Sequence, residues 1–486
     1  MDSAAVVVVG AGAAGLALAC RLGEQGAGGV VLVEAPPGPQ RSPERTWCSW
    51  GSDAYWVDAV SARWDRVSVH APGGSARTYD LAPLDYTMIR SRDYERVAAA
   101  RLARTSVRRV EALVTGVEDG PSQAVVHGPD LRAGWVFDTR PAAPAHPGRV
   151  ALLQHFRGWF VRTRQDAFDP TVAGLMDFRP PQPPGGVAFG YLLPTSPREA
   201  LVEYTEFSRS PLTTAQYDAA LADYTLLLGL PAYDVVGAEQ GAIPMTDAPF
   251  PRRLGQRVFR LGAAGGATRP ATGYTFTAAQ RQARAVAEAL RDGRDPCPPA
   301  AYTRRHRWMD ALLLRALDDG AIDGATFLAE LFARHPTERV LRFLDGKTSP
   351  REDLAVMASA PKAAMIRTAM GGVGAAVQHL EVTHDFALPL ERVAAYLSEP
   401  EHLEALFGGP VSVTRAVPNE LVEYHETKGG PLGRHRGALR LARKGSGATL
   451  SCEIEFEAKA PLLGRAGTLA LEGKLRKGLR MVDLRA

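Results

Sequence analysis

The glycine-rich stretch near the start of the chain constrains the fold most. Residues 4–21 read AAVVVVGAGAAGLALACR, a β-branched run followed by three spaced glycines and an apolar helical pattern. A second strand-like run, GVVLVE, ends at Glu34. The glycines let backbone N–H groups approach a pyrophosphate at the helix N-terminus, and the acid can accept from a ribose hydroxyl. We therefore expect a dinucleotide contact at Gly10, Gly12, Ala13, Ala14, Gly15 and Glu34.

A second glycine cluster favours FAD among the dinucleotides. Residues 257–290, RVFRLGAAGGATRPATGYTFTAAQRQARAVAEAL, read as a strand, a glycine-rich loop and an amphipathic helix. Such a loop can lie over the pyrophosphate and ribityl chain, with the helix N-terminus facing the flavin. The expected contacts in this loop are Gly262, Gly265, Gly266, Gly273 and Tyr274.

The overall composition sets limits on the class of protein. The 486 residues exceed what one ordinary core needs, so two or three domains are expected. A net charge of +4, without a concentrated basic run, argues against a nucleic-acid partner. The four cysteines lack metal-ligand spacing and indicate a reducing compartment, so we expect no metal site. The first residues carry no basic segment typical of a signal peptide, which favours a cytoplasmic protein.

Two apolar strands flank a short hairpin loop in residues 187–208. The second strand, ALVEYTEFS, contains Glu203 and Glu206 in a run that otherwise reads as buried. Three positions separate the two acids, so they face opposite sides of the strand. We expect an antiparallel substrate sheet inserted within about residues 140–250, with Glu203 toward the site and Glu206 solvated or salt-bridged.

The order of motifs resembles the bacterial FAD-dependent lycopene cyclase family. The similar segments are ERTWCSW, YTMIRS, VFDTRP, LMDFR, YLLPTS with ALVEYTEFS, GAIPM and LGAAGGATRPATGYTF, within roughly residues 4–360. This resemblance implies a membrane-associated flavoprotein that cyclises the ψ-ends of lycopene, usually to β-ionone rings (γ-carotene, then β-carotene), without net redox change. It also implies that reduced FAD is needed, with NAD(P)H as an external reductant, and it leaves other carotenoid-pathway enzymes as possible partners.

The chemistry that the resemblance implies needs an acid in a dry pocket. A carboxyl on a buried strand stays protonated at neutral pH because desolvation disfavours its charged form. The family's acidic motif, similar to F-L-E-E-T, aligns its first Glu with Glu203 and its second with Tyr204, which is a departure. Glu203 is thus the candidate proton donor or cation stabiliser.

Other residues of the resembling segments are candidates for the same site. Asp177 and Arg179, at spacing two, can pair near the pocket, and Asp138 and Arg45 are expected either to contact FAD or to brace its domain. Aromatic faces can stabilise a cation. The expected pocket aromatics are Trp47, Trp50, Trp159, Tyr191 and Tyr204.

Two other functions remain open. A flavin monooxygenase acting on an apolar terpenoid would share this fold, but such enzymes usually carry D-G near the third strand and G-D in the late loop. Here those places read FDTRP and LGAAGG, with Ala263 where the aspartate would lie. A non-catalytic flavoprotein that binds carotenoid or lipid is the other alternative.

The helices near residues 300–335 predict an apolar and basic surface suited to peripheral attachment to a membrane. Its expected members are Leu312, Leu313, Leu314, Phe327, Leu328, Leu331 and Phe332, beside Arg304, Arg305, Arg307 and Arg315.

After residue 378 the pattern of strands begins again. One strand, paired short helices and several alternating strands resemble a START-like (polyketide cyclase/dehydrase-like, helix-grip) domain, although the long C-terminal helix of such domains is not evident. The expected organisation is an α/β, glutathione-reductase-like FAD domain with its inserted sheet and helical end over residues 1–360, a linker over 361–378, and a small α+β domain over 379–486. The sequence leaves open the ring type, the number of ends cyclised, and the oligomeric state.

Overall fold

The computed structural model describes residues 2–41, 43–51, 54–183, 185–373, 377–407, 410–426, 435–457, 472–473 and 475–482. The chain divides into two compact units, Met1–Met365 and Ile366–Ala486. Helix α9 (Lys362–Val373) crosses this boundary and occupies most of the segment that the sequence analysis assigns to a linker.

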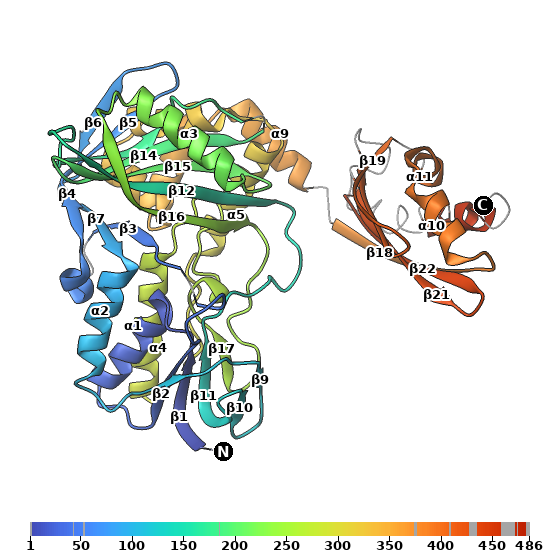
Figure 1. The fold of residues 1–486 in the computed structure, drawn as a ribbon, viewed down its shortest axis with the longest axis horizontal. Coiled ribbons are helices and arrows are strands. Elements are labelled where there is room, and N and C mark those ends of the chain that lie inside the picture. Colours follow the sequence, from blue (N-terminus) through green and yellow to red (C-terminus); the bar gives the residue numbers. More distant parts are fainter. Residues whose placement is uncertain are drawn as a thin grey trace. The chain divides into compact units, whose positions relative to one another are not determined.

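A largely parallel sheet forms the base of the first unit (Figure 1). Across the described residues its order is β8 (Arg108–Glu111), β2 (Val30–Glu34), β1 (Asp2–Val9), β11 (Leu131–Asp138), β10 (Ala124–His127) and β9 (Gly116–Glu118), with β17 (Val258–Arg260) also paired to β11. The alternating valines of β1 pack into two different cores, because both faces of the sheet are covered. The helices on one face are α1 (Ala13–Glu24), α2 (Ser91–Leu102) and α4 (Phe276–Arg291).

A second, mostly antiparallel sheet lies beyond the carboxyl ends of these parallel strands (Figure 1). Its order is β16 (Tyr233–Thr246), β12 (Ala151–Thr163), β15 (Glu199–Ser208), β14 (Val187–Ser196), β13 (Val172–Asp177), β5 (Arg66–His70) and β6 (Ala76–Asp80). The expected hairpin is present as β14 and β15, joined at Pro197 and Arg198. Helix α3 (Thr214–Leu227) covers one face of β12 and β15, so the two faces of β15 have different surroundings.

A small sheet connects the two larger ones. It consists of β3 (Thr46–Trp50), β7 (Tyr86–Arg90) and β4 (Ala62–Trp64), and the short helix η1 (Ala54–Ala59) follows β3. Because side chains alternate along a strand, Thr46, Cys48 and Trp50 share one face of β3, while Trp47 and Ser49 share the other.

The helical end of this unit packs inward. It comprises α5 (Arg304–Asp318), α6 (Gly324–Arg334), α7 (Thr337–Leu344) and α8 (Pro350–Ser359). The prediction that these helices expose an apolar surface is wrong for most of the residues assigned to it. The following residues are part of the core: Leu313, Leu314, Phe327, Leu328, Leu331 and Phe332. The large apolar side chains that are exposed on α5 and α8 are Trp308, Leu354 and Met357.

The second unit is an antiparallel sheet with short helices. The described strands are ordered β18 (Val377–Phe386), β22 (Gly447–Glu457), β21 (His435–Lys444), β20 (Leu421–Glu426) and β19 (Val411–Val417). The helices α10 (Leu390–Ser398) and α11 (Pro400–Phe407) lie between β18 and β19 in the chain.

A C-terminal helix is present in this unit, which corrects the sequence analysis. Residues 475–482 are helical, and Leu475, Leu479 and Val482 are buried in the core of the unit. The i, i+4, i+7 spacing places these three side chains on one helix face. The segment is short and strongly basic, so its period is difficult to recognise from sequence. The alternating run GTLALEGKL at residues 467–475 predicts a further strand, and it lies mostly outside the described residues.

Candidate active site

The first glycine turn forms an open, uncapped helix N-terminus. Gly10 has φ +97°, a conformation that favours glycine. Gly15 packs against the carbonyl of Gly10, so a side chain there would collide with the backbone. Gly12, by contrast, is exposed, and a Cβ at this position would meet nothing within 4 Å. No side chain caps α1, so its N–H groups can receive an anion, as a pyrophosphate requires.

Two acids at the ends of the strands on either side of β1 are held by arginines. Glu34, the last residue of β2, forms ion pairs with Arg41 at 2.5 Å and Arg109 at 3.0 Å. Asp138, the last residue of β11, binds Arg140 at 2.7 Å. Arg140 also donates to the Val114 carbonyl at 2.6 Å, so this pair links the end of β11 to the segment before β9.

The second glycine segment lies against the first. The loop begins with the short helix η2 (Gly262–Gly265), and Gly262 approaches Ala14 of α1. Gln282 of α4 accepts from the N–H of Gly262 and donates to the Gly265 carbonyl, which fixes the turn. Gly266 and Gly273 have φ of +74° and +72°. The Gln154 amide oxygen is buried beside Gly273 without a hydrogen-bond partner in the described part of the chain. The open helix end, the close glycines and this free acceptor fit a dinucleotide such as FAD.

Later helices anchor the same loop. Arg269 and Asp310 of α5 form a fully buried ion pair at 3.0 Å. Thr272 donates to the Leu344 carbonyl at 3.0 Å, and Thr277 donates to Asp345 at 2.6 Å. The shape of the loop therefore depends on residues 304–345.

Two glutamates share one face of the antiparallel sheet. Gly158 of β12 is paired with Glu203 on β15 and with Glu239 on β16. Directly opposed residues of antiparallel strands project to the same face of the sheet. Both carboxyls therefore lie on the face that a side chain at position 158 would occupy. A Cβ added at Gly158 would be 3.5 Å from Glu203 Cβ and 3.5 Å from Glu239 Cγ. The same Cβ would be 2.7 Å from Leu201 Cδ1, so Gly158 adds no side chain of its own to the space between the two acids, and Leu201 packs over the glycine.

The two carboxyls have different environments. Burial raises the pKa of Glu203 to about 8, and the negative charge of Glu239 adds to this effect. Thr205 donates the only described hydrogen bond to Glu203, at 2.9 Å. Burial also raises the pKa of Glu239, to about 7, but three groups oppose the shift. These groups are a hydrogen bond from Thr46 at 2.8 Å and the charges of Arg90 and Arg45. Glu203 is thus the better proton holder, and Glu239 the more readily ionised group.

Aromatic and apolar groups surround Glu203 on this face. Tyr191 of β14 lies directly opposite Glu203, and burial raises its pKa, with further contributions from Tyr274 and Glu203. Trp50 packs edge-on against Tyr274, with ring centroids 4.5 Å apart. Burial raises the pKa of the Cys48 thiol, and the charges of both glutamates add to it. Trp50, Tyr191 and Tyr274, all expected near the site, are therefore on the Glu203 side.

Other expected site residues lie elsewhere. Tyr204 and Trp159 lie on the opposite face, under α3, and Trp159 donates to Asp218 at 3.1 Å. The expectation that these two line the pocket with Glu203 is wrong in this geometry, since neighbours on one strand point to opposite faces. Trp47 lies on the outer face of β3 and stacks on Phe276.

Asp177 and Arg179 pair, as their spacing predicts, but apart from Glu203. Their ion pair measures 2.5 Å, and Tyr224 of α3 donates to Asp177 at 3.3 Å. Arg45 lies near Glu239, and its backbone binds Ser91 in both directions.

Glu206 is on the opposite face from Glu203, as expected, but it is buried and not solvated. It is 5% exposed, and its Oε2 atom lies 3.8 Å from His155 Nε2. Burial lowers the pKa of His155 and raises that of Glu206, so both side chains favour their neutral forms. His155 binds Tyr217 and Ser208, each at 2.7 Å.

Sequence analysis missed Glu239. It lies in a strand whose apolar alternation is weak, and only the register of β16 on β12 places it near Glu203. The sequence does contain one usable signal for Glu239. It is an acid four residues before Ile243 of the GAIPM segment, in a strand expected to pair with a neighbour that contains a glycine.

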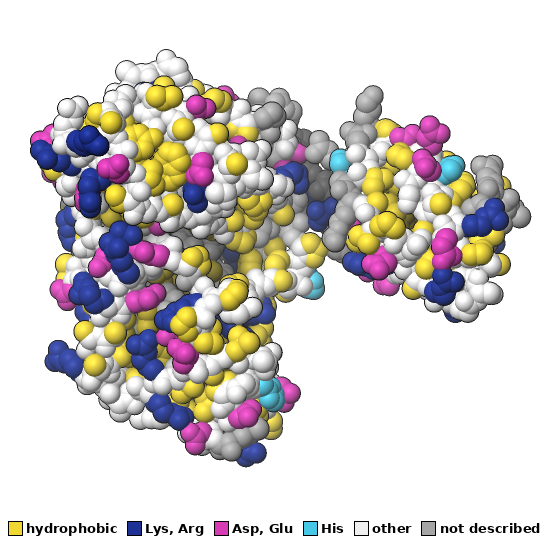
Figure 2. Space-filling model, in the orientation of Figure 1, with side chains coloured by type: hydrophobic (Ala, Val, Ile, Leu, Met, Phe, Trp, Pro, Cys, Tyr) yellow, Lys and Arg dark blue, Asp and Glu magenta, His cyan; other side chains and the backbone are white. Residues whose placement is uncertain are grey.

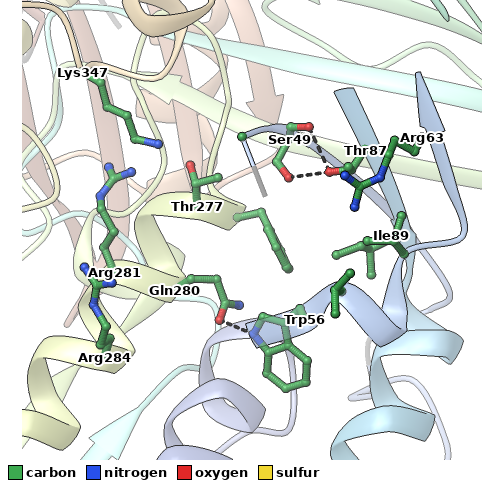
Figure 3. A pocket seen from close by; sticks show the side chains of 14 residues that line it. Ser49, Trp56, Arg63, Thr87, Ile89, Thr277, Gln280, Arg281, Arg284 and Lys347 are labelled. Carbon is green, nitrogen blue, oxygen red and sulfur yellow. Dashed lines mark hydrogen bonds between the residues drawn. The ribbon is translucent and has the colours of Figure 1, made fainter. Parts of the chain in front are cut away.

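A pocket of about 290 Å³ opens on the outer face of β3 and β7 (Figure 3). Trp56, Ile89 and Phe276 give it apolar walls, and Trp56 donates to Gln280 at 2.7 Å. Its basic members are Arg63, Arg281, Arg284 and Lys347. Ser49, on the outer face of β3, lines this pocket, so the pocket lies across β3 from the glutamate pair.

Two kinds of feature are absent from the described residues. No cluster of potential metal ligands occurs among them. None of their helices is both long and apolar enough to cross a membrane. On the face seen in Figure 2, basic and acidic side chains are interspersed over the first unit.

Comparison with known proteins identifies the family. The family model described as lycopene cyclase protein matches residues 5–370. The chain belongs to the lycopene cyclase family.

The fold has similar solved structures. A geranylgeranyl bacteriochlorophyll reductase-like protein of Thermoplasma acidophilum is 15% identical, with a TM-score of 0.54 over 76% of this chain and 98% of that chain. This similarity shows a shared fold. The p-nitrophenol 4-monooxygenase PnpA of Pseudomonas putida DLL-E4 is 18% identical, with a TM-score of 0.49 over 72% of this chain and 100% of that chain. No curated protein matches the sequence significantly.

Proposed function

We propose that the first unit binds FAD and catalyses the non-redox cyclisation of the ψ-ends of lycopene to β-ionone rings. Membership of the lycopene cyclase family supports the substrate class. The observation that carries the proposal is Glu203, a carboxyl with a pKa raised to about 8 beside Tyr191 and an apolar core.

Ring formation begins with protonation of a carbon–carbon double bond. Carbon is a weak base, so the donor has to be a carboxylic acid kept protonated in a dry site. Glu203 meets this requirement at neutral pH, because burial disfavours its carboxylate. Trp50 and Tyr191 line the same side, where aromatic faces stabilise a carbocation.

The glycine segments 10–15 and 262–273 are the proposed FAD site. Gly12 and the N-terminus of α1 would hold the pyrophosphate, and the Gly262–Gly265 turn would lie along the ribityl chain. Reduced FAD, when bound, would supply an electron-rich ring able to stabilise a cation. NAD(P)H is proposed as its external reductant.

Product analysis tests the assignment. Expression in a lycopene-accumulating host should yield cyclic carotenoids, and purified protein with reduced FAD should convert lycopene without consuming hydride. Oxygenated products would indicate the monooxygenase alternative, and retained, unchanged lycopene would indicate a binding protein. Either result would overturn the proposal.

Membrane attachment is proposed through the exposed residues of α5 and α8. Trp308 and Leu354 are 52% and 67% exposed, and the Arg305–Asp353 ion pair holds the two helices together. Exposed Arg304, Arg307 and Arg351 flank them, and apolar residues with basic neighbours suit an anionic interface. Trp308→Ser should reduce cosedimentation with anionic vesicles; unchanged cosedimentation would contradict this surface.

We propose a START-like carotenoid- or lipid-binding role for the second unit. The order of one strand, two short helices and further antiparallel strands supports it, as does the apolar face of helical residues 475–482. Carotenoid binding by the isolated unit would test this role.

A further inference from the structure

We infer that Glu239 is a second catalytic carboxyl, the base that removes the ring proton and returns it to Glu203. This inference rests on the proposed cyclase function. It starts from the sheet register, in which Gly158 of β12 lies between Glu203 and Glu239 on the strands to either side.

The geometry brings the two acids to one space. Strands two places apart in a sheet lie roughly 10 Å from each other at the backbone, and side chains as long as glutamate span much of that distance. Gly158 adds no side chain between the acids; a Cβ there would lie 3.5 Å from both glutamate side chains and 2.7 Å from Leu201 Cδ1. The two carboxyls are close enough for the charge of Glu239 to raise the pKa of Glu203, and the inferred proton transfer runs between them.

The hydrogen bonds distinguish the roles of the two groups. Thr46 donates to Glu239 Oε2 at 2.8 Å and so favours its carboxylate. Arg90 and Arg45 face the same carboxyl, with Glu44 opposing them. Glu203 faces Tyr191 and Cys48, which carry no charge at neutral pH, and its charged neighbour is Glu239 itself. When the two carboxyls share one proton, Glu203 is therefore the protonated group and Glu239 the carboxylate.

The reaction balances without a further reagent. The O–H bond of Glu203 breaks as a C–H bond forms at a terminal double bond of the polyene. The electron pair of a second double bond closes the ring, and a cation forms on the ring. A ring C–H bond then breaks, its electrons form the ring double bond, and the proton passes to the Glu239 carboxylate. Transfer of that proton to Glu203 restores both groups, and no electrons are gained or lost.

The test uses the full-length protein with reduced FAD and lycopene in D₂O. In Glu239→Gln the first proton transfer remains possible, but loss of the ring proton is slow, so the cation returns to lycopene. We expect ring formation to fall about 100-fold or more, with deuterium appearing in the recovered lycopene. Glu203→Gln should show neither ring formation nor deuterium, and Glu206→Gln should behave like the unsubstituted protein.

Two results would overturn the role of Glu239. One is cyclisation by Glu239→Gln at the unsubstituted rate. The other is an inactive, FAD-bound Glu239→Gln whose recovered lycopene contains no deuterium, since a structural defect or a role in the first step would produce that pattern. Failure of the cyclase function itself is distinguishable, because the unsubstituted protein would then form no rings.

Discussion

Thr46 and Glu239 are hydrogen-bonded at 2.8 Å although 193 positions separate them in the chain. The bond joins β3, which follows the glycine turn and β2 in the chain, to β16, the last strand of the antiparallel sheet. It therefore orients a carboxyl of the substrate sheet from the side of the proposed cofactor domain. Thr46→Val keeps the shape of this side chain and removes the donor, so it should raise the pKa of Glu239.

The first prediction concerns the two acids of β15. Glu203→Gln should lower the cyclisation rate by roughly 10²–10⁴-fold with FAD content unchanged, because it removes the acidic proton and keeps the side-chain volume. Glu206→Gln, under α3 on the opposite face, should retain most activity. Product formation by both purified variants measures this, and an active Glu203→Gln beside an inactive Glu206→Gln would contradict the assignment.

The second prediction concerns pH. Activity requires Glu203 protonated and Glu239 ionised, with pKa values of about 8 and about 7. The rate should fall as pH rises above about 8 and as it falls below about 7, which gives a narrow bell-shaped profile. Glu239→Gln should remove the acidic limb from its residual activity and move the alkaline limb to lower pH, because a neighbouring negative charge is lost. A flat profile between about pH 6 and pH 9 would contradict this.

The third prediction concerns stability. Both carboxyls have folded-state pKa values above the ordinary 4.5, so between that value and about 8 the folded state binds more protons than the unfolded chain. Their contribution to the free energy of unfolding therefore falls as pH rises through this window. At pH 8, Glu203→Gln should increase the free energy of unfolding by about 1–2 kcal/mol and so raise the Tm by a few °C. Near pH 5 the increase in Tm should be smaller. Thermal unfolding at both pH values measures the difference, and an equal change at both would count against the buried-acid assignment.

The fourth prediction concerns FAD binding. Gly12 has open space around it, so Gly12→Val should fold normally but fill the space over the N-terminus of α1 and abolish bound flavin. Gly28 is a matched control, since a Cβ there also meets nothing within 4 Å. Absorbance of the purified variants at flavin wavelengths, together with their Tm values, separates cofactor loss from unfolding. A Gly12→Val protein that retains full FAD occupancy would refute the placement of the pyrophosphate at the N-terminus of α1.

The fifth prediction concerns the second unit. A chain ending at Val373 retains Ala364 and Met365, which pack on the core of the first unit. It should remain a folded flavoprotein with residual cyclase activity, because Glu203 and Glu239 both lie in the first unit. Complete loss of activity at normal FAD content would instead assign part of the active site to residues 374–486.

The sequence alone predicts the local features of this site, but not which strands pair to form it. Gly10, Gly12, Gly15 and Glu34 lie where the strand–turn–helix pattern predicts, because neighbouring residues determine that geometry. The opposite orientations of Glu203 and Glu206 likewise follow from strand period alone.

Contacts across strands required the structure. Glu239 approaches Glu203 only through the register of two strand pairs, which no local pattern specifies. The motif resemblance predicts Tyr204 in the same pocket as Glu203, but adjacent residues in a strand cannot share a face. The leucines of α5 and α6 face inward because the covering sheet offers them a core, whereas amphipathic spacing alone does not say which partner a helix face meets.

The buried pair of Arg269 and Asp310 has a consequence for how the protein is made. Together with the bonds from Thr272 to Leu344 and from Thr277 to Asp345, it ties the second glycine loop to helices encoded much later. A growing chain that has passed residue 273 holds both glycine segments but lacks the groups that give the second one its shape. Stable capture of the flavin should therefore begin only after residue 345 has emerged from the ribosome.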